Sequence, residues 1–219
     1  MAEKYGTIPP RFTKEWWDYC WYYYKWHVTI TLVAVIVAAV TIVQCVNRPI
    51  YDMTVIYAGH MNYSEGEKER LEAILNAYVT DIDGNGKTAV DFQRLMFSGA
   101  AGNEEYDYAM QTKLDLTFTE KNTALYLMDR EEAEFYLKRS SVADAFMNTD
   151  DYAADTEKEI LRAADGTGYA VNLSDSTILK ESNIYCDDLF VLVRLDNADE
   201  NENNQVFKDA VNIAKELIN

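Results

Sequence analysis

The chain has 219 residues, which is enough for one sizeable domain and a shorter appendage. It carries 20 basic and 37 acidic residues, for a net charge of −17. Five basic and three acidic residues precede residue 50, a net of +2, so the segment 50–219 holds −19. So acidic a segment repels the phosphate backbone, which argues against nucleic-acid partners.

The three cysteines are far apart in the sequence, and only Cys186 lies within the segment 50–219. A single cysteine cannot form an internal disulfide, and no pair has the spacing of a metal site. The acidic segment must therefore fold around an ordinary hydrophobic core.

An apolar run covers residues 28–46, with the sequence VTITLVAVIVAAVTIVQCV. As a helix rising ~1.5 Å per residue, it would cross a hydrocarbon core about 30 Å thick. A dense aromatic group precedes it and fits the headgroup level of a membrane. This group comprises Trp16, Trp17, Tyr19, Trp21, Tyr22, Tyr23, Tyr24 and Trp26. The pattern predicts one transmembrane helix with an aromatic juxtamembrane belt.

Four of the five basic residues before residue 50 also precede the apolar run, so the positive-inside rule predicts the orientation. Residues 1–27 would form a cytoplasmic tail, and 50–219 an extracytoplasmic domain at the cell membrane. A cleaved signal peptide would need a shorter apolar core and small residues at the cleavage site. A lipoprotein would need a small residue before Cys45, where Gln44 stands. We therefore expect an uncleaved signal-anchor.

The acidic segment begins with a strand over Asp52–Ala58 that is apolar on both faces, as in a buried strand. Ser64 and Glu67 then form the S-x-x-E pattern of a capping box. Apolar residues follow at helical spacing, at Leu71, Ile74, Leu75 and Tyr78. Strand, short loop and capped helix together indicate the start of a βαβ unit.

Further strands are predicted at Thr88–Phe97, Thr123–Met128, Tyr169–Leu173 and Asp188–Arg194. Helices are predicted at Arg130–Lys138 and near the C-terminus, with short helices and loops over 140–168. The segment 104–121 fits a helix through Met110, Leu114 and Phe118, or a strand through Leu114, Leu116 and Phe118; we choose helix. The alternation predicts an α/β fold, a three-layer sandwich with a mostly parallel sheet, preceded by one transmembrane helix.

Several of these motifs resemble a known family. The order of buried strand, capped helix, acidic glycine-rich loop and strand is similar to that of membrane-anchored, solute-binding-protein-like proteins of Gram-positive bacteria. Thr123–Asp129 (TALYLMD) followed at once by a helix, and the later Tyr169–Ser176, extend the resemblance over residues 50–219. The resemblance implies a reduced periplasmic-binding fold with one lobe instead of two. It implies no binding residues, because no motif of this chain carries them.

The segment Asp81-Ile-Asp83-Gly-Asn85-Gly86-Lys87 matches positions 1, 3, 5 and 6 of a calcium-binding loop. The twelfth position should be acidic but is Phe92, and Asp91 falls one place early. One interpretation is a weak calcium site formed by Asp81, Asp83, Asn85, the Lys87 carbonyl and Asp91. The other is an acidic turn whose glycines supply positive φ.

The loop Gly59–Ser64 follows the first strand and precedes a helix N-terminus. Ligands of open α/β sheets bind at the carboxyl ends of strands, and helix N-termini favour anions. The candidate ligand-binding residues are therefore His60, Asn62 and Ser64. The competing interpretation is an ordinary surface loop.

The sequence lacks HExxH, GxSxG, Walker A, CxxC and dinucleotide GxGxxG motifs, and it has two histidines. We therefore expect a protein without enzymatic activity and without a cofactor, calcium apart. The predicted function is that of a membrane-tethered interaction domain, an accessory subunit that binds a protein partner in a cell-envelope or transport complex. The alternative is a small-ligand-binding or sensor domain related to solute-binding proteins.

Overall fold

The computed structural model describes residues 9–46, 50–99, 103–139, 143, 145–186, 188–195 and 204–219. The chain divides into two compact units, Met1–Pro49 and Ile50–Asn219.

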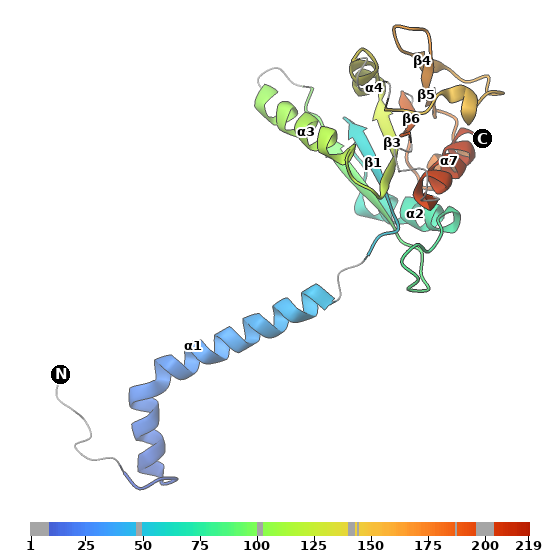
Figure 1. Ribbon diagram of the computed structural model, residues 1–219. Helices are drawn as coiled ribbons and strands as arrows, with labels where there is room; N and C mark the ends of the chain where they lie inside the picture. The colour runs from blue at the N-terminus through green and yellow to red at the C-terminus, as the bar shows by residue number, and fades with distance from the viewer. Residues whose placement is uncertain are drawn as a thin grey trace. The chain divides into compact units, whose positions relative to one another are not determined.

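The described residues of the first unit, 9–46, contain one helix, α1, over Lys14–Val46 (Figure 1). The backbone N–H of Trp16 bonds to the hydroxyl oxygen of Thr13 at its start, and the 33-residue helix contains no proline or glycine. It is long and apolar enough to cross a membrane. The predicted span 28–46 is its C-terminal part, because the aromatic residues before the span continue the same helix.

The second unit contains a six-stranded mixed sheet with the strand order β2-β1-β3-β6-β5-β4 (Figure 1). The strands are β1 (Met53–Gly59), β2 (Val90–Met96), β3 (Thr123–Asp129), β4 (Ile160–Arg162), β5 (Gly168–Asn172) and β6 (Leu189–Val193). Strand β1 pairs in parallel with both β2 and β3. The other pairings, β3 with β6, β6 with β5 and β5 with β4, are antiparallel.

The predicted α/β fold is confirmed, but the prediction of a mostly parallel sheet is wrong. Parallel neighbours need a crossover of about a dozen residues or more, usually a helix. Strands β4 and β5 are instead joined by a tight turn in which Gly166 has φ +87°. Between β5 and β6 the only described helix is α6 (Thr177–Glu181), about 7.5 Å long, which is too short to carry the chain back along the sheet.

Helices cover both faces of the sheet, which gives three layers. One face packs against α2 (Glu65–Leu75), α6 and α7 (Gln205–Ile218) through a core that includes Val55 and Leu71. The other packs against α3 (Glu104–Thr117) and α4 (Arg130–Leu137) through a core that includes Ile56 and Tyr136. Short 3₁₀ turns occupy Asn76–Tyr78 and Thr149–Asp151.

The structure confirms helix rather than strand within 104–121. Leu114 is fully buried there, whereas Leu116 is 62% exposed, so the two do not share a buried strand face. Strand β4 and helix α6 were not predicted. Both are short, of three and five residues, and too brief to show a hydrophobic period.

The paths of the chain after β1 and β3 create a topological switch point. These two strands are parallel neighbours, and β1 leads to α2 on one face while β3 leads to α4 on the other. The connections therefore diverge at the carboxyl ends of the two strands. In open α/β sheets, ligands bind in the crevice at such a point.

Candidate ligand-binding site

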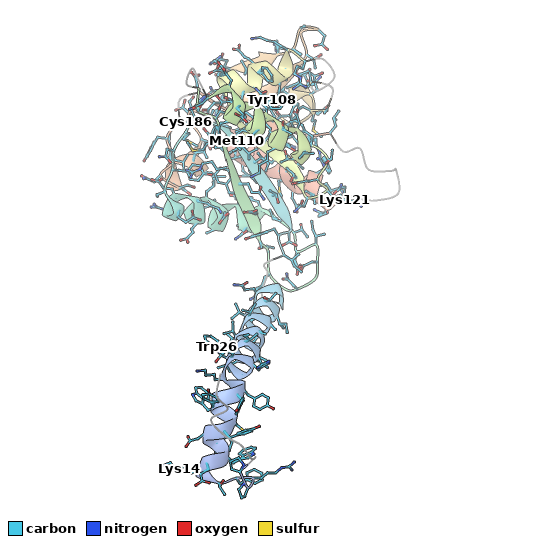
Figure 2. All side chains as sticks on the ribbon, turned by 90° about the vertical axis from the view of Figure 1, so that its left-hand side faces the viewer. Lys14, Trp26, Tyr108, Met110, Lys121 and Cys186 are labelled. Carbon is cyan, nitrogen blue, oxygen red and sulfur yellow. The ribbon has the colours of Figure 1, made fainter. Side chains whose placement is uncertain are left out.

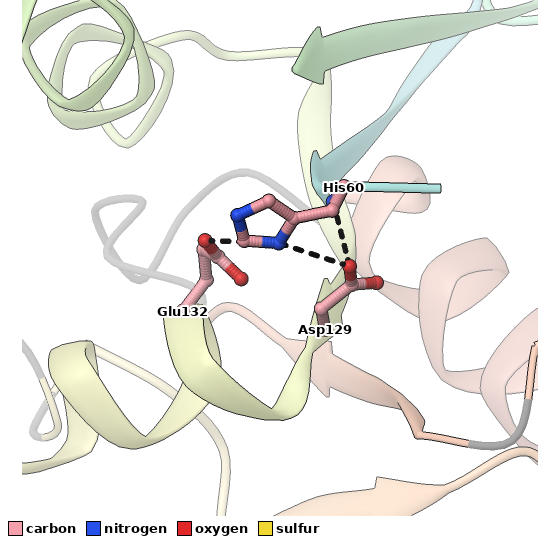
Figure 3. Close-up of side chains that lie close together, drawn as sticks. All are labelled: His60, Asp129 and Glu132. Atoms are coloured by element: carbon pink, nitrogen blue, oxygen red, sulfur yellow. Dashed lines mark hydrogen bonds and ion pairs between the residues drawn. The ribbon is translucent and has the colours of Figure 1, made fainter. Parts of the chain in front are cut away.

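Three ionisable side chains meet at the β1/β3 switch point (Figure 3). His60 directly follows β1, Asp129 is the last residue of β3, and Glu132 lies in the first turn of α4. The Nδ1 atom of His60 is 3.6 Å from Oδ2 of Asp129 and 3.8 Å from Oε1 of Glu132. Both separations exceed the length of a direct hydrogen bond.

The carboxylate of Asp129 is held from two sides. The hydroxyl of Tyr57 donates to Oδ1 over 2.9 Å, and the backbone N–H of His60 donates to Oδ2 over 2.6 Å. The Tyr57 oxygen in turn accepts a hydrogen bond from the backbone N–H of Met61. Burial, and next the charge of Asp129, raise the pKa of the Tyr57 hydroxyl, so it stays a proton donor.

Glycine is required where Asp129 meets β1. A Cβ atom on Gly59 would lie 2.3 Å from Cγ of Asp129, closer than any non-bonded carbon pair. The absence of a side chain at Gly59 therefore lets the carboxylate reach the backbone of the neighbouring strand.

Glu132 is the buried member of the cluster, with 7% of its surface exposed. Its Oε2 atom has no hydrogen-bond partner among the residues that the structure describes. Burial raises the pKa of Glu132 to about 7. To a smaller extent, the backbone N–H of Glu132 and the nearby His60 lower this pKa, and Asp129 raises it. A buried carboxylate oxygen without a donor is one that a cation or a proton can stabilise.

A cavity of about 130 Å³ opens beside His60 and Glu132. Aromatic and acidic side chains dominate its lining. The lining residues are His60, Phe97, Gly99, Asp107, Gln111, Glu131, Glu132, Phe135 and Tyr136. Gly99 has φ +58°, and a Cβ there would lie 2.6 Å from Nε2 of His60, so this loop packs directly on the imidazole.

Of the three residues predicted to bind a ligand, only His60 lines this cavity. The side-chain oxygen of Asn62 accepts a hydrogen bond from Arg94 over 3.0 Å. Ser64 is the N-cap of α2, where its hydroxyl accepts from the backbone N–H of Glu67 and its own N–H bonds to the Glu67 carboxylate. The predicted capping box is confirmed. The Ser64 side chain therefore caps the helix and does not line the cavity.

The loop 81–87 is held by its own hydrogen bonds. Asp81 accepts from the backbone N–H groups of Gly84 and Gly86, each over 2.7 Å, and these bonds lower its pKa. Asp83 accepts from the backbone N–H of Asn85, and the side-chain oxygen of Asn85 accepts from the backbone N–H of Lys87. Gly84 and Gly86 have φ of +72° and +80°, as expected of a glycine turn.

Two of the five residues predicted to bind calcium do lie together with a third acid. Oxygen atoms of Asp81, Asp83 and Asp52 fall within 4.8 Å of one another. Asp91 is not in this group; it contacts Lys68 at 3.9 Å and accepts from Gln93. The internal hydrogen bonds favour the acidic-turn interpretation of this loop over the calcium site.

Asp129 and Glu132 were not predicted as site residues. The sequence did contain a clue, because Asp129 directly follows the apolar residues of a strand and begins a turn into a helix. Its proximity to His60 depends on the pairing of β1 with β3, two strands that are far apart in the sequence. A polar residue at the end of each predicted strand is therefore the feature to search for.

Comparison of the chain with models of protein families, with curated proteins and with solved structures found no match. The resemblance to solute-binding-like proteins stays a prediction.

Proposed function

We propose that this protein is a membrane-tethered domain that binds a small, positively charged ligand at the carboxyl ends of β1 and β3. The observation that carries the proposal is the buried carboxylate of Glu132, which lies beside His60 at the switch point of the sheet and whose Oε2 has no hydrogen-bond partner among the described residues.

The lining of the cavity supports a cationic ligand. Asp107, Glu131 and Glu132 contribute acidic groups, and the described lining residues include no lysine or arginine. Phe97, Phe135 and Tyr136 supply aromatic surface, and aromatic faces attract ammonium groups as well as apolar atoms. A volume of about 130 Å³ fits a small amine or a metal ion, not a large solute.

The tether follows from α1 and from the charge distribution. We place residues 1–27 in the cytoplasm and 50–219 outside it, with the apolar helix uncleaved, on the positive-inside argument. Protease added to intact cells should then remove a C-terminal epitope tag and spare an N-terminal one. Protection of the C-terminal tag until the cells are broken would reverse this orientation.

Native mass spectrometry of the full-length protein in mild detergent tests the ligand directly. We expect the wild-type protein to retain a bound species, and Glu132→Gln to lose it. Glu134→Gln is the matched control, because Glu134 lies on the same helix but does not line the cavity, and it should keep the ligand. Equal retention by Glu132→Gln, or no bound species in the wild type, would contradict the proposal.

A specific observation favours a second function, the binding of a protein partner. Helix α3 carries Tyr108, which is labelled in Figure 2. Tyr108 is 72% exposed, and Leu116 on the same helix is 62% exposed. They are eight residues apart, about two helical turns, and so lie toward one side of the helix. An accessory subunit of a cell-envelope or transport complex would use such a surface. Recovery of a stoichiometric partner by wild type, and its loss in Tyr108→Ser, would support this function.

A further inference from the structure

We propose that His60, Asp129 and Glu132 bind a divalent transition-metal ion of the Zn²⁺ class. This inference rests on the proposed function and names the chemical class of the cation in that pocket. It is distinct from the calcium site predicted for the loop 81–87. Asp52, whose carboxylate lies near Asp81 and Asp83, precedes β1, whereas His60 follows β1, so the two sites lie at opposite ends of this strand.

The separations between His60 and the two acids are slightly longer than those of metal ligands. Around a tetrahedral metal with bonds of about 2.0–2.1 Å, ligand atoms are about 3.3–3.4 Å apart. His60 Nδ1 is 3.6 Å from Asp129 and 3.8 Å from Glu132, and one donor atom from each side chain falls within 4.8 Å of the others. A shift of a few tenths of an ångström would complete the geometry for His60 with either acid.

Glu132 provides an independent indication of a ligand. Its carboxylate is turned toward His60 and Asp129 (Figure 3), and its Oε2 has no partner among the described residues. A buried carboxylate oxygen without a donor is unfavourable unless a cation or a proton compensates it. A metal ion between the three side chains would be that cation.

The surroundings of Asp129 match those of a metal ligand. Carboxylates that coordinate metals are usually oriented by hydrogen bonds from a second layer of residues. Tyr57 orients Oδ1 of Asp129, and the N–H of His60 orients Oδ2 while leaving that oxygen a further lone pair. The side chain is therefore already fixed in direction.

The donor set indicates which metal class fits. One imidazole nitrogen with two carboxylates suits Zn²⁺ and its neighbours in the first transition row, whereas Mg²⁺ and Ca²⁺ prefer oxygen donors alone. Three protein ligands leave a fourth position, as in open zinc sites. The cavity beside His60 and Glu132 is where that position can be reached by water or by a ligand.

Isothermal titration of the full-length, chelator-treated protein with ZnCl₂ tests the inference. We expect one high-affinity site, with affinity lower by at least about tenfold in His60→Gln and in Glu132→Gln. Asp83→Asn, in the other carboxylate group, and His27→Ala, in α1, should leave the affinity unchanged. Near-ultraviolet circular dichroism confirms that each variant is folded, and Glu132→Gln, which removes a buried charge, should fold readily.

The possible outcomes distinguish a failure of the metal assignment from a failure of the proposed function. Loss of zinc binding in Asp83→Asn or His27→Ala alone, or equal affinity in every variant, would overturn the metal assignment. So would a wild type that ignores zinc but retains an organic amine lost in Glu132→Gln, although that result would uphold the proposed function. If wild type bound neither, both proposals would fall.

Discussion

The hydroxyl of Tyr57 donates a 2.9 Å hydrogen bond to Oδ1 of Asp129, and this bond joins the carboxyl ends of two parallel strands. The same hydroxyl oxygen accepts from the N–H of Met61, in the loop that carries His60. One buried phenol thus fixes both the carboxylate of β3 and the start of the loop after β1. The candidate site is therefore built into the ends of two neighbouring strands of the sheet.

Replacing Tyr57 with phenylalanine should leave Asp129 and the Met61 N–H each short of a partner. We expect a loss of about 1–3 kcal/mol in the free energy of unfolding, and a roughly tenfold loss in affinity for Zn²⁺. Chemical denaturation and titration calorimetry measure the two effects. Tyr63→Phe is the control, because the Tyr63 hydroxyl has no partner among the described residues and its removal should cost little.

Gly59→Ala should displace the Asp129 carboxylate, because the added Cβ would lie 2.3 Å from its Cγ. Such overpacking costs about 1–3 kcal/mol, and binding at the site should weaken with it. Gly66→Ala, which has open space around it in α2, should instead stabilise the protein by about 0.5–1 kcal/mol. Equal melting temperatures for the two variants would show that Gly59 has no role in positioning Asp129.

Stability should depend on pH through Glu132. Burial raises the pKa of Glu132 from 4.5 to about 7, so between these pH values the folded protein keeps a proton that the unfolded chain has lost. The free energy of unfolding should therefore fall as pH rises from 4.5 to 7, by up to ~3 kcal/mol, and then level off. Urea denaturation in the presence of a chelator measures this fall. Glu132→Gln should abolish it, whereas Glu134→Gln should follow the wild type; parallel pH profiles for wild type and Glu132→Gln would refute the assignment.

Ser64→Ala should affect the helix and not the site. Loss of the N-cap bond to Glu67 is expected to lower the free energy of unfolding by about 1 kcal/mol. Affinity for the ligand should stay unchanged, because Ser64 does not line the cavity. Thermal denaturation together with zinc titration checks both statements. A loss of zinc affinity without a loss of stability would show that Ser64 belongs to the binding site.

The loop 81–87 should be insensitive to calcium. Its carboxylates already accept hydrogen bonds from their own backbone, so the turn needs no ion to form. We expect millimolar calcium to leave the melting temperature unchanged, and Asp81→Ala to lower it with or without calcium. A calcium-dependent rise in the melting temperature that Asp81→Ala removes would establish the calcium site instead.

Much of the fold could be predicted from sequence because the determinants are local. The apolar residues of β1, the S-x-x-E pattern at Ser64 and the stripe of α7 each act within a few residues. The directions of β4, β5 and β6 could not be predicted, because they depend on which strands pair and on how the chain connects them. Without an internal repeat or a long crossover, nothing in the periodicity distinguishes a parallel neighbour from an antiparallel one.

The site was only partly predictable, for a related reason. His60 was identified because it follows a buried strand, but Asp129 and Glu132 join it only through the pairing of β1 with β3. Their chemistry arises from tertiary burial, which a sequence pattern does not report. Asn62 and Ser64 were predicted from their position in the same loop. In the structure the Asn62 side chain bonds to Arg94, and the Ser64 side chain caps α2.

The most direct test of the central claim is a crystal structure of the full-length protein grown with ZnCl₂, with anomalous data collected at the zinc edge. The account predicts an anomalous peak about 2.0–2.2 Å from donor atoms of His60, Asp129 and Glu132. A peak at Asp81 and Asp83 alone, or water in the cavity bonded to Glu132 with no anomalous signal, would contradict it.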